Sequence, residues 1–507
     1  MTTLVPRKPY TEDELGRLYP PGLELRLVQI LMRHGERTPV SARFENAGLR
    51  PYWPYCASAR QMKSAILAHG GDKGDAPFST LEWKRRLETF GGNDEPIIAS
   101  GPKGQVDDVC DMGSLTDTGR QSTYRLGLRL RSLYVDRLKF LPPTVSSTDF
   151  MYLRSTSIPR ALESMQQTFA AMYPPSVREP DETGRFPAPL IITRAPPDET
   201  LFPNDSNCRR FAQLSRAFAQ RTAEKWNSTE DMEYLNKLIG KWMPPEKPRV
   251  AVDSHPRLIG IMDTVNATDA HGPETRLPAE FYDPRARKIM EKIGMEEWYA
   301  GYKESKEYRA LGIGGLLGDV VQRMVGVAER PCQPIKLGLS GCHDTTLAAV
   351  LTSLGYETDE WPRFTSHIAI EMFRKSNPAG EGWGSALFGR ATSAGIGRKP
   401  TPELTLFDKK KMDGYYVRLR YNDEPVIIPG CRLTGNHLEG DESFCTLVSD
   451  PWQAVLSHTP NSRHRPLSRK LWTSLHQKTG EFNVTQTLTY REYQPENPSR
   501  PGFDLGD

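Results

Sequence analysis

Two arginines and a histidine follow the end of an apolar run near the start of the chain. The run covers 27–32 ("LVQILM"), and Arg33, His34 and Arg37 come directly after it. Guanidinium groups present planar forks that match phosphate oxygens, and they stay charged at any working pH. An imidazole among like charges has its cationic form disfavoured, which keeps a ring nitrogen available as a nucleophile. The spacing therefore predicts a site that binds and attacks a phosphoryl group.

Two later apolar runs end in groups that would complete this chemistry. Arg154 ends one run, and His343 and Asp344 follow another. A third arginine would help to stabilise the charge spread over the equatorial oxygens of a phosphoryl group during transfer. A carboxylic acid such as Asp344 can protonate the leaving alkoxide and then activate water. We predict a phosphohistidine on His34, formed without a metal or other cofactor because the arginines supply the positive charge.

These groups meet only if the runs that carry them are strands of one sheet. Nearly continuous apolar runs are typical of buried parallel strands. We expect strands at 24–32, 150–155, 189–195, 335–341, 365–374 and 415–428. We expect helices from Thr116, from near Pro159 and over 345–355. The alternation predicts an α/β fold with a mainly parallel sheet and helices on both faces, in which ligands bind beyond the carboxyl ends of the strands.

Composition divides the chain into a core with inserted segments. The α/β core is assigned to 22–45, 115–200 and 335–460. The inserted, mostly helical cap is assigned to 46–114 and 201–334, and a C-terminal extension to 461–507. Within the first insert we expect irregular chain with a short helical patch near 79–88. The glycine-rich stretch at 376–400 predicts a flexible loop.

The overall charge excludes some classes of partner. The 507 residues include 66 basic and 63 acidic side chains, so the formal net charge is +3. This balance gives no support to a nucleic-acid or membrane-surface protein. No apolar run reaches the roughly 18 residues of a transmembrane helix. We therefore expect a small-molecule phosphomonoester as the partner, with no nucleic acid and no transmembrane segment.

The N-terminus and the cysteines bear on the compartment. The first residues show no apolar segment typical of a secretory signal, and Glu12, Asp13 and Glu14 are unlike an acid-poor transit peptide. We predict an intracellular, cytoplasmic protein, with a mitochondrial address as the alternative. The seven cysteines are odd in number, and without a signal peptide they favour reduced thiols.

The motif at 33–39, "RHGERTP", resembles the signature of the histidine acid phosphatases, branch 2 of the histidine phosphatase superfamily. Later segments also resemble the family, at 113–134, 150–174, 337–355, 361–373 and 415–431. The overall look is closest to the lysophosphatidic acid phosphatase branch. The resemblance implies a phosphoglycerate mutase-like, three-layer α/β/α core with an inserted helical cap.

The resemblance also implies roles for individual residues. His34 would be the nucleophile and Asp344 the proton donor, in agreement with the chemistry argued above. The phosphate pocket would consist of Arg33, Arg37, Arg154 and His343. Cys431 and Cys445 resemble a paired-cysteine hairpin found in secreted members of the family.

We therefore expect a metal-independent phosphomonoester hydrolase, which the resemblance implies to be of the histidine acid phosphatase type. A phosphomutase would use the same pocket, but such proteins are usually shorter and lack so large a cap. A catalytically silent phosphate-binding protein would need the arginines but no proton donor, so the presence of both His34 and Asp344 speaks against it. The substrate stays open among lysophospholipid phosphates, inositol phosphates and other small phosphomonoesters.

Overall fold

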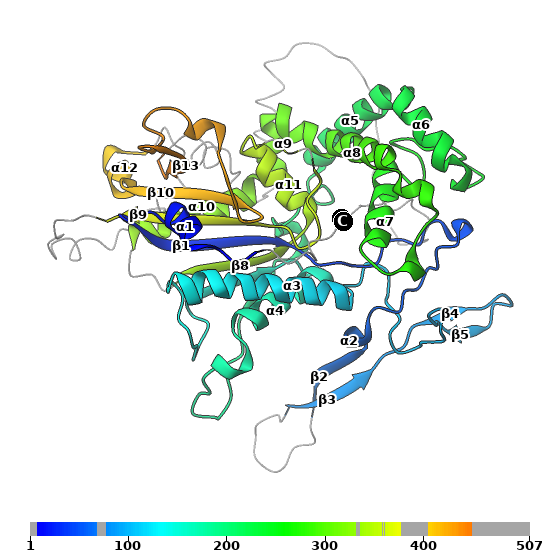
Figure 1. The fold of residues 1–507 in the computed structure, drawn as a ribbon, viewed down its shortest axis with the longest axis horizontal. Coiled ribbons are helices and arrows are strands. Elements are labelled where there is room, and N and C mark those ends of the chain that lie inside the picture. The colour runs from blue at the N-terminus through cyan, green and yellow to red at the C-terminus, as the bar shows by residue number, and fades with distance from the viewer. Residues whose placement is uncertain are drawn as a thin grey trace, which may run out of the picture.

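A nine-stranded sheet forms the centre of the molecule (Figure 1). The structure, a computed structural model, describes residues 8–67, 78–330, 335–356, 358, 360–376 and 404–448. The strand order is β12-β13-β10-β9-β1-β8-β6-β7, and β11 pairs with β10. The strands are β1 (Leu23–Arg33), β6 (Met151–Ser155), β7 (Ile191–Ile192), β8 (Leu337–Cys342), β9 (His367–Lys375), β10 (Tyr415–Tyr421), β11 (Glu424–Val426), β12 (His437–Leu438) and β13 (Asp441–Thr446).

The sheet is mixed. Strands β1, β8, β6 and β7 are parallel neighbours. From β9 outward each pairing is antiparallel, including that of β9 with β1. The predicted α/β class is confirmed, but the sheet is only partly parallel, because the strands that follow β8 in the chain, β9 to β13, all pair antiparallel. In the parallel part, the carboxyl ends of β1, β8 and β6 lie at one edge.

Helices cover both faces of the sheet. One face carries α1 (Glu12–Leu18), α3 (Asp117–Leu130) and α4 (Pro159–Met172), and the other carries α10 (Gly314–Glu329), α11 (Asp344–Ser353) and α12 (Leu406–Met412). β1 serves both faces, since Val28 and Ile30 face the first group and Leu27 and Leu31 face the second. The expected start of α3 is confirmed, because the side chain of Thr116 accepts a hydrogen bond from the Gly119 amide.

A second helical layer stands beyond the ends of the parallel strands (Figure 1). It consists of α5 (Arg209–Trp226), α6 (Glu230–Ile239), α7 (Leu258–Asp269), α8 (Pro284–Glu304) and α9 (Lys306–Gly312). Helices α5, α6, α7 and α8 share their own apolar cluster, which includes Trp226 and Ile293 and extends to Trp361 of the core, whereas Tyr308 of α9 packs in the cluster on the sheet. Helix α10, which the sequence composition assigns to the cap, packs through Val320 and Val321 on the sheet.

The first insert forms two projecting hairpins (Figure 1). After α2 (Ala57–Arg60), β2 (Gln61–Leu67) pairs with β3 (Phe78–Lys84), and β4 (Glu88–Phe90) pairs with β5 (Pro96–Ile98). The predicted helical patch near 79–88 is therefore wrong. Leu81 and Trp83 alternate with polar neighbours, which is a strand pattern, and β2 supplies the partner that the local sequence does not reveal.

Two disulfides correct the expectation of reduced thiols. Cys56 is bonded to Cys110, and Cys431 to Cys445, so the hairpin pairing implied by the family resemblance is confirmed. Cysteine count was a poor guide because pairing depends on which residues the fold brings together. In the described part of the chain, Cys342 is a buried free thiol whose pKa is raised to about 12 by burial.

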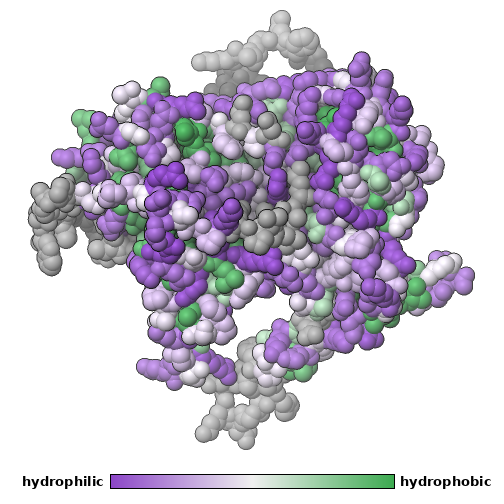
Figure 2. All heavy atoms as spheres, in the orientation of Figure 1, coloured by the Kyte–Doolittle hydropathy of each residue, from purple (hydrophilic) through white to green (hydrophobic). Residues whose placement is uncertain are grey.

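The outer surface seen in Figure 2 is mainly hydrophilic, with scattered hydrophobic residues. Among the described helices, none is by itself long and apolar enough to cross a membrane, although the bent pair α9 and α10 meets the length and composition criteria together. The predicted loop at 376–400, apart from its first residue, and the extension at 461–507 lie outside the described residues.

Candidate active site

The six candidate residues come from three adjacent strand ends. Arg33 is the last residue of β1 and lies opposite Cys342 of β8, and the His34 amide donates to the carbonyl of Cys342 over 3.1 Å. The His34 and His343 ring centroids are 5.6 Å apart. All six residues are buried, and none is more than 4% exposed: Arg33, His34, Arg37, Arg154, His343 and Asp344. A buried cluster of this kind requires specific partners for each charge.

Close backbone packing holds the loop after β1. A Cβ atom at Gly35 would collide with the backbone of Gly119, and one at Gly119 would collide with the backbone of Glu36. The first turn of α3 therefore lies directly against the loop, and both contacts require glycine. The Thr116 amide adds a hydrogen bond of 3.0 Å to the Glu36 carbonyl.

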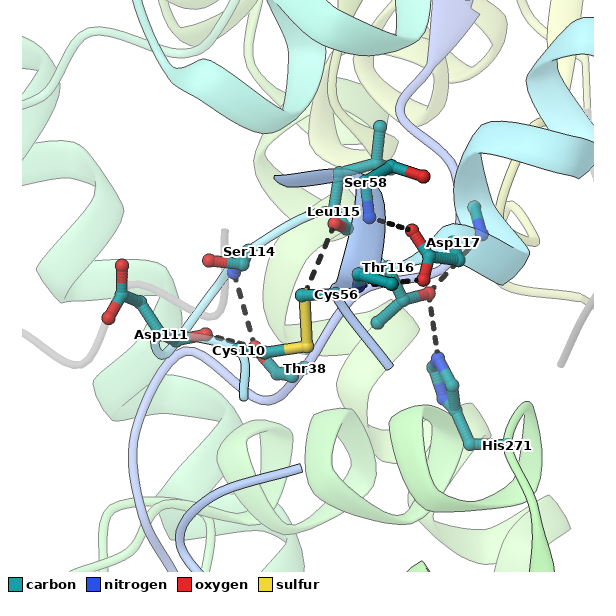
Figure 3. Close-up of a disulfide and its surroundings, with 12 residues drawn as sticks. Thr38, Cys56, Ser58, Cys110, Asp111, Ser114, Leu115, Thr116, Asp117 and His271 are labelled. Atoms are coloured by element: carbon teal, nitrogen blue, oxygen red, sulfur yellow. Dashed lines mark hydrogen bonds between the residues drawn. A yellow bond between two sulfur atoms is a disulfide. The ribbon is translucent and has the colours of Figure 1, made fainter. Parts of the chain in front are cut away.

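The far end of the same loop is tied to the first insert (Figure 3). The Thr38 hydroxyl donates to the carbonyl of Asp111 over 2.7 Å, and the Thr38 amide donates to the Ser114 carbonyl over 3.1 Å. The Cys56–Cys110 disulfide lies beside these bonds and joins the two ends of the insert. The insert thus fixes the position of Arg37, the residue before Thr38.

The orientation of the His34 ring favours one nucleophilic nitrogen. Nδ1 lies 2.9 Å from the carbonyl oxygen of Gly35. A carbonyl can only accept, so Nδ1 carries the proton and the lone pair is on Nε2. The centre of the Phe364 ring lies 5.9 Å from that of the His34 ring. The same Phe364 ring lies 4.2 Å from the Arg33 guanidinium and 5.8 Å from the Arg37 guanidinium. One aromatic ring therefore supports the nucleophile and two of the arginines.

Carboxylates hold the guanidinium groups of Arg33 and Arg37. Arg33 contacts Oδ2 of Asp344 at 2.7 Å. Arg37 contacts both oxygens of Asp263 on α7, at 2.8 and 3.4 Å. Because buried ion pairs are costly to break on one side, each carboxylate fixes its arginine in place before substrate arrives.

Arg154 is anchored in a similar way. Its terminal nitrogens lie 2.6 Å from Oε1 of Glu199 and 3.1 Å from Oδ2 of Asp319. The chain just after Arg154 also contacts the cluster, because the Thr156 hydroxyl lies 3.2 Å from Nε2 of His343. The structure thus brings Arg33, His34 and Asp344 into direct or near contact, and places Arg154 at the neighbouring strand end.

Asp344 is the first residue of α11, and donors surround it. Its Oδ2 accepts from Nε1 of Trp361 over 2.7 Å in addition to Arg33, and its Oδ1 accepts from the amide of Thr345 over 2.7 Å. The Tyr299 ring of α8 stacks on Trp361, with centroids 5.4 Å apart. The indole therefore orients the proposed proton donor.

Sequence reasoning missed five residues of the site. Trp361 and Phe364 lie in the stretch that resembles the family, but we interpreted that stretch only as a strand. The carboxylate partners had no local signal, because they are far from their arginines along the chain: Asp263, Glu199 and Asp319. Among the described residues, no group of three or more His, Cys, Asp or Glu side chains is arranged to hold a metal ion.

Comparisons with known proteins show which family the chain is similar to. The family model of the histidine phosphatase superfamily, branch 2, matches residues 24–422. A probable acid phosphatase of Schizosaccharomyces pombe is 35% identical, over 85% of this chain and 91% of its own length. Lysophosphatidic acid phosphatase type 6 of Homo sapiens is 26% identical, over 69% of this chain and 74% of its own.

A solved structure shows the same fold at low identity. A Hafnia alvei phytase, solved in complex with myo-inositol hexakis sulphate, aligns with a TM-score of 0.50 and 12% identity. The alignment covers 87% of this chain and 99% of the phytase. With the family match over most of its length, the chain belongs to branch 2 of the histidine phosphatase superfamily and is a histidine acid phosphatase, an enzyme that hydrolyses phosphomonoesters.

Proposed function

We propose that the residues at the ends of β1, β6 and β8 hydrolyse small-molecule phosphomonoesters through a phosphohistidine. His34 is the nucleophile and Asp344 the proton donor. The phosphate oxygens are held by Arg33, Arg37, Arg154 and His343. The observation that supports this most strongly is the His34 ring, whose Nδ1–H bond to Gly35 leaves the lone pair on Nε2, beside buried guanidinium groups.

Substrate binding would change the partners of Arg33. In the structure this guanidinium contacts the Asp344 carboxylate at 2.7 Å. An incoming phosphate dianion would share or take over that guanidinium, and its own charge would lie close to Asp344. A like charge nearby favours the protonated form of a carboxyl group. Binding of the phosphate thus prepares Asp344 to act as an acid.

The reaction then proceeds in two chemical steps. Nε2 of His34 attacks phosphorus and forms the P–N bond, while the bond to the leaving oxygen breaks and Asp344 gives its proton to that oxygen. The products are a free alcohol, a phosphohistidine and an Asp344 carboxylate. In the second step the carboxylate removes a proton from water, the oxygen of that water attacks phosphorus, and the P–N bond breaks.

The arginines supply the positive charge that a divalent cation supplies in other phosphatases. We therefore propose that neither step requires a metal. The division of the chain into core and cap, with the cap selecting the alcohol, is part of the same proposal. It is supported by the contact of Asp263 on α7 with Arg37 and of Tyr299 on α8 with Trp361.

The compartment stays a prediction. The predicted address is an intracellular one, cytoplasmic or mitochondrial. The two disulfides favour an oxidising compartment instead, because thiols stay reduced in the cytosol. The absence of nucleic-acid partners, expected from the balanced charge, likewise stays a prediction.

Turnover of para-nitrophenyl phosphate by the wild type and by His34→Ala tests the proposed function. We expect release of inorganic phosphate by the wild type and no detectable turnover by the variant, whose fold circular dichroism should show to be intact. Normal turnover by a folded His34→Ala enzyme would reject His34 as the nucleophile.

A further inference from the structure

A cavity of about 490 Å³ lies among the helices beyond the strand ends. Helix α5 forms one wall, and the opposite side is formed by the starts of α7 and α9 and the second half of α8. Its lining combines polar and apolar surface and includes Arg209, Arg216, Arg257, Glu297 and Trp298. The proposed mechanism uses none of these residues.

The elements that line the cavity also contact the catalytic cluster. Helix α7 lines the cavity with Ile259 and carries Asp263, the partner of Arg37. Trp298 lies 6.4 Å from Trp361, which donates to the proposed proton donor.

The chain segment before α5 makes the third connection. Asp205 lines the cavity, and Phe202, three residues earlier, packs 6.1 Å from the ring of His343. Elements that line the cavity therefore reach His343 through Phe202, and Asp344 through the rings of Trp298 and Trp361. A leaving alcohol would depart toward Asp344, which protonates the leaving oxygen, and so toward this wall of the cavity.

Three buried polar atoms of the lining residues lack a hydrogen-bond partner among the described residues. They are Oε2 of Glu297, Nε of Arg257 and Nε1 of Trp298. The Glu297 side chain is only 4% exposed, and its other oxygen is paired with Arg257. A buried polar group without a hydrogen-bond partner is unfavourable, so atoms of this kind are expected to meet a polar ligand or water.

The charges at the cavity favour an anion. Arg209 and Arg216 line it without an ion pair to any described residue, whereas Arg210 on the same helix is paired with Glu307. Burial raises the pKa of Glu297 to about 7, and burial also raises the pKa of Asp205. The three guanidinium groups at the cavity, those of Arg209, Arg216 and Arg257, therefore outnumber the two carboxyl groups of Asp205 and Glu297.

We propose that this cavity is a leaving-group subsite for phosphomonoesters whose alcohol carries a second anionic group, a phosphate or a carboxylate. Arg209 and Arg216 bind that second group, while the buried donors and acceptors bind hydroxyl or carbonyl groups between the two anions. This inference rests on the proposed function, because it assumes that the first phosphate is held at His34.

A series of synthetic substrates of increasing length tests the subsite. We would compare α,ω-alkanediol bisphosphates of increasing length with alkyl monophosphates of the same length, and ω-carboxyalkyl phosphates as the second anionic arm. The measured quantity is the ratio of kcat/KM for the doubly anionic ester to that for the matched monoester. At the best length the wild-type ratio should exceed about 10, since a charge-assisted hydrogen bond is worth more than about 1.4 kcal/mol.

Arg209→Ala and Arg216→Ala should each lower this ratio by about 10-fold. Arg210→Ala is the matched control, because its side chain pairs with Glu307 outside the cavity, and it should leave the ratio unchanged. A wild-type ratio near one at every length, or equal losses in Arg210→Ala, would overturn the subsite. Absence of all monoester hydrolysis would instead reject the proposed function.

Discussion

Replacing Asp344 with asparagine should impair only those reactions whose leaving group needs a proton. An alkyl phosphate expels a strongly basic alkoxide, whereas nitrophenolate leaves readily without help. The asparagine side chain has nearly the shape of the native aspartate but no acidic proton. We therefore expect a large loss of kcat on an alkyl phosphate and a small one on para-nitrophenyl phosphate.

The surroundings of Asp344 set the size of this loss. General acid catalysis contributes roughly 10²- to 10⁴-fold. Asp344 is 4% exposed and is enclosed by Arg33, Trp361 and the Thr345 amide, so bulk water has little access to replace its proton. We expect a loss in the upper half of that range, about 10³- to 10⁴-fold, for the alkyl ester. For the nitrophenyl ester we expect about 10-fold or less.

The assay is kcat for both esters in wild type and Asp344→Asn, with phosphoenzyme measured in parallel. With the activated ester, the phosphoenzyme should accumulate, because the same carboxylate activates the water. Asp263→Asn is the matched control, since it removes a carboxylate from Arg37 rather than from the leaving group, and its losses should be similar on both esters. Equal losses on both esters in Asp344→Asn, without accumulated phosphoenzyme, would refute the assignment.

Three further predictions concern the surroundings of the site. Trp361→Phe keeps an aromatic ring to stack on Tyr299 but removes the 2.7 Å hydrogen bond to Asp344. It should therefore lower kcat about 10-fold on alkyl phosphates and little on para-nitrophenyl phosphate. Equal losses of kcat on both esters would show that Trp361 only packs. Exhaustive treatment with EDTA should leave turnover intact, whereas a loss that Mg²⁺ or Zn²⁺ restores would contradict the role given to the arginines. Burial lowers the pKa of His271 from 6.5 to about 4. As the pH falls, the imidazole is therefore protonated in the unfolded chain before it is protonated in the folded one. Up to about 3 kcal/mol of folding stability should be lost between pH 6.5 and pH 4. In His271→Asn the thermal midpoint of unfolding should depend less on pH over this range. The same pH dependence in the variant and the wild type would show that His271 does not cause the loss of stability.

The strand ends of the parallel part were predictable because local patterns define them. The apolar run before Arg33 is buried on both faces of the sheet, so its length and its end are visible in the sequence. Thr116 and Pro159 mark helix starts through local backbone chemistry. The positions of the candidate residues at neighbouring strand ends followed from these elements.

Features that depend on distant partners were not predictable in this way. Asp263 reaches Arg37 only because α7 packs against the loop after β1, and no spacing in the sequence announces that contact. Trp361 resembles an ordinary core residue until Asp344 is placed beside its indole nitrogen. The strand β3 was mistaken for a helix because its pairing with β2 is tertiary information.

The central claim is that His34 carries the phosphoryl group during turnover. Brief mixing of the enzyme with radiolabelled phosphomonoester, followed by a quench in base, should trap a phosphoenzyme that is stable to alkali and labile to acid, as expected of a phosphoramidate. Peptide mapping should place the label on His34, and a folded His34→Ala enzyme should carry none. A label that survives acid, that maps to another residue or that persists in the variant would contradict the account.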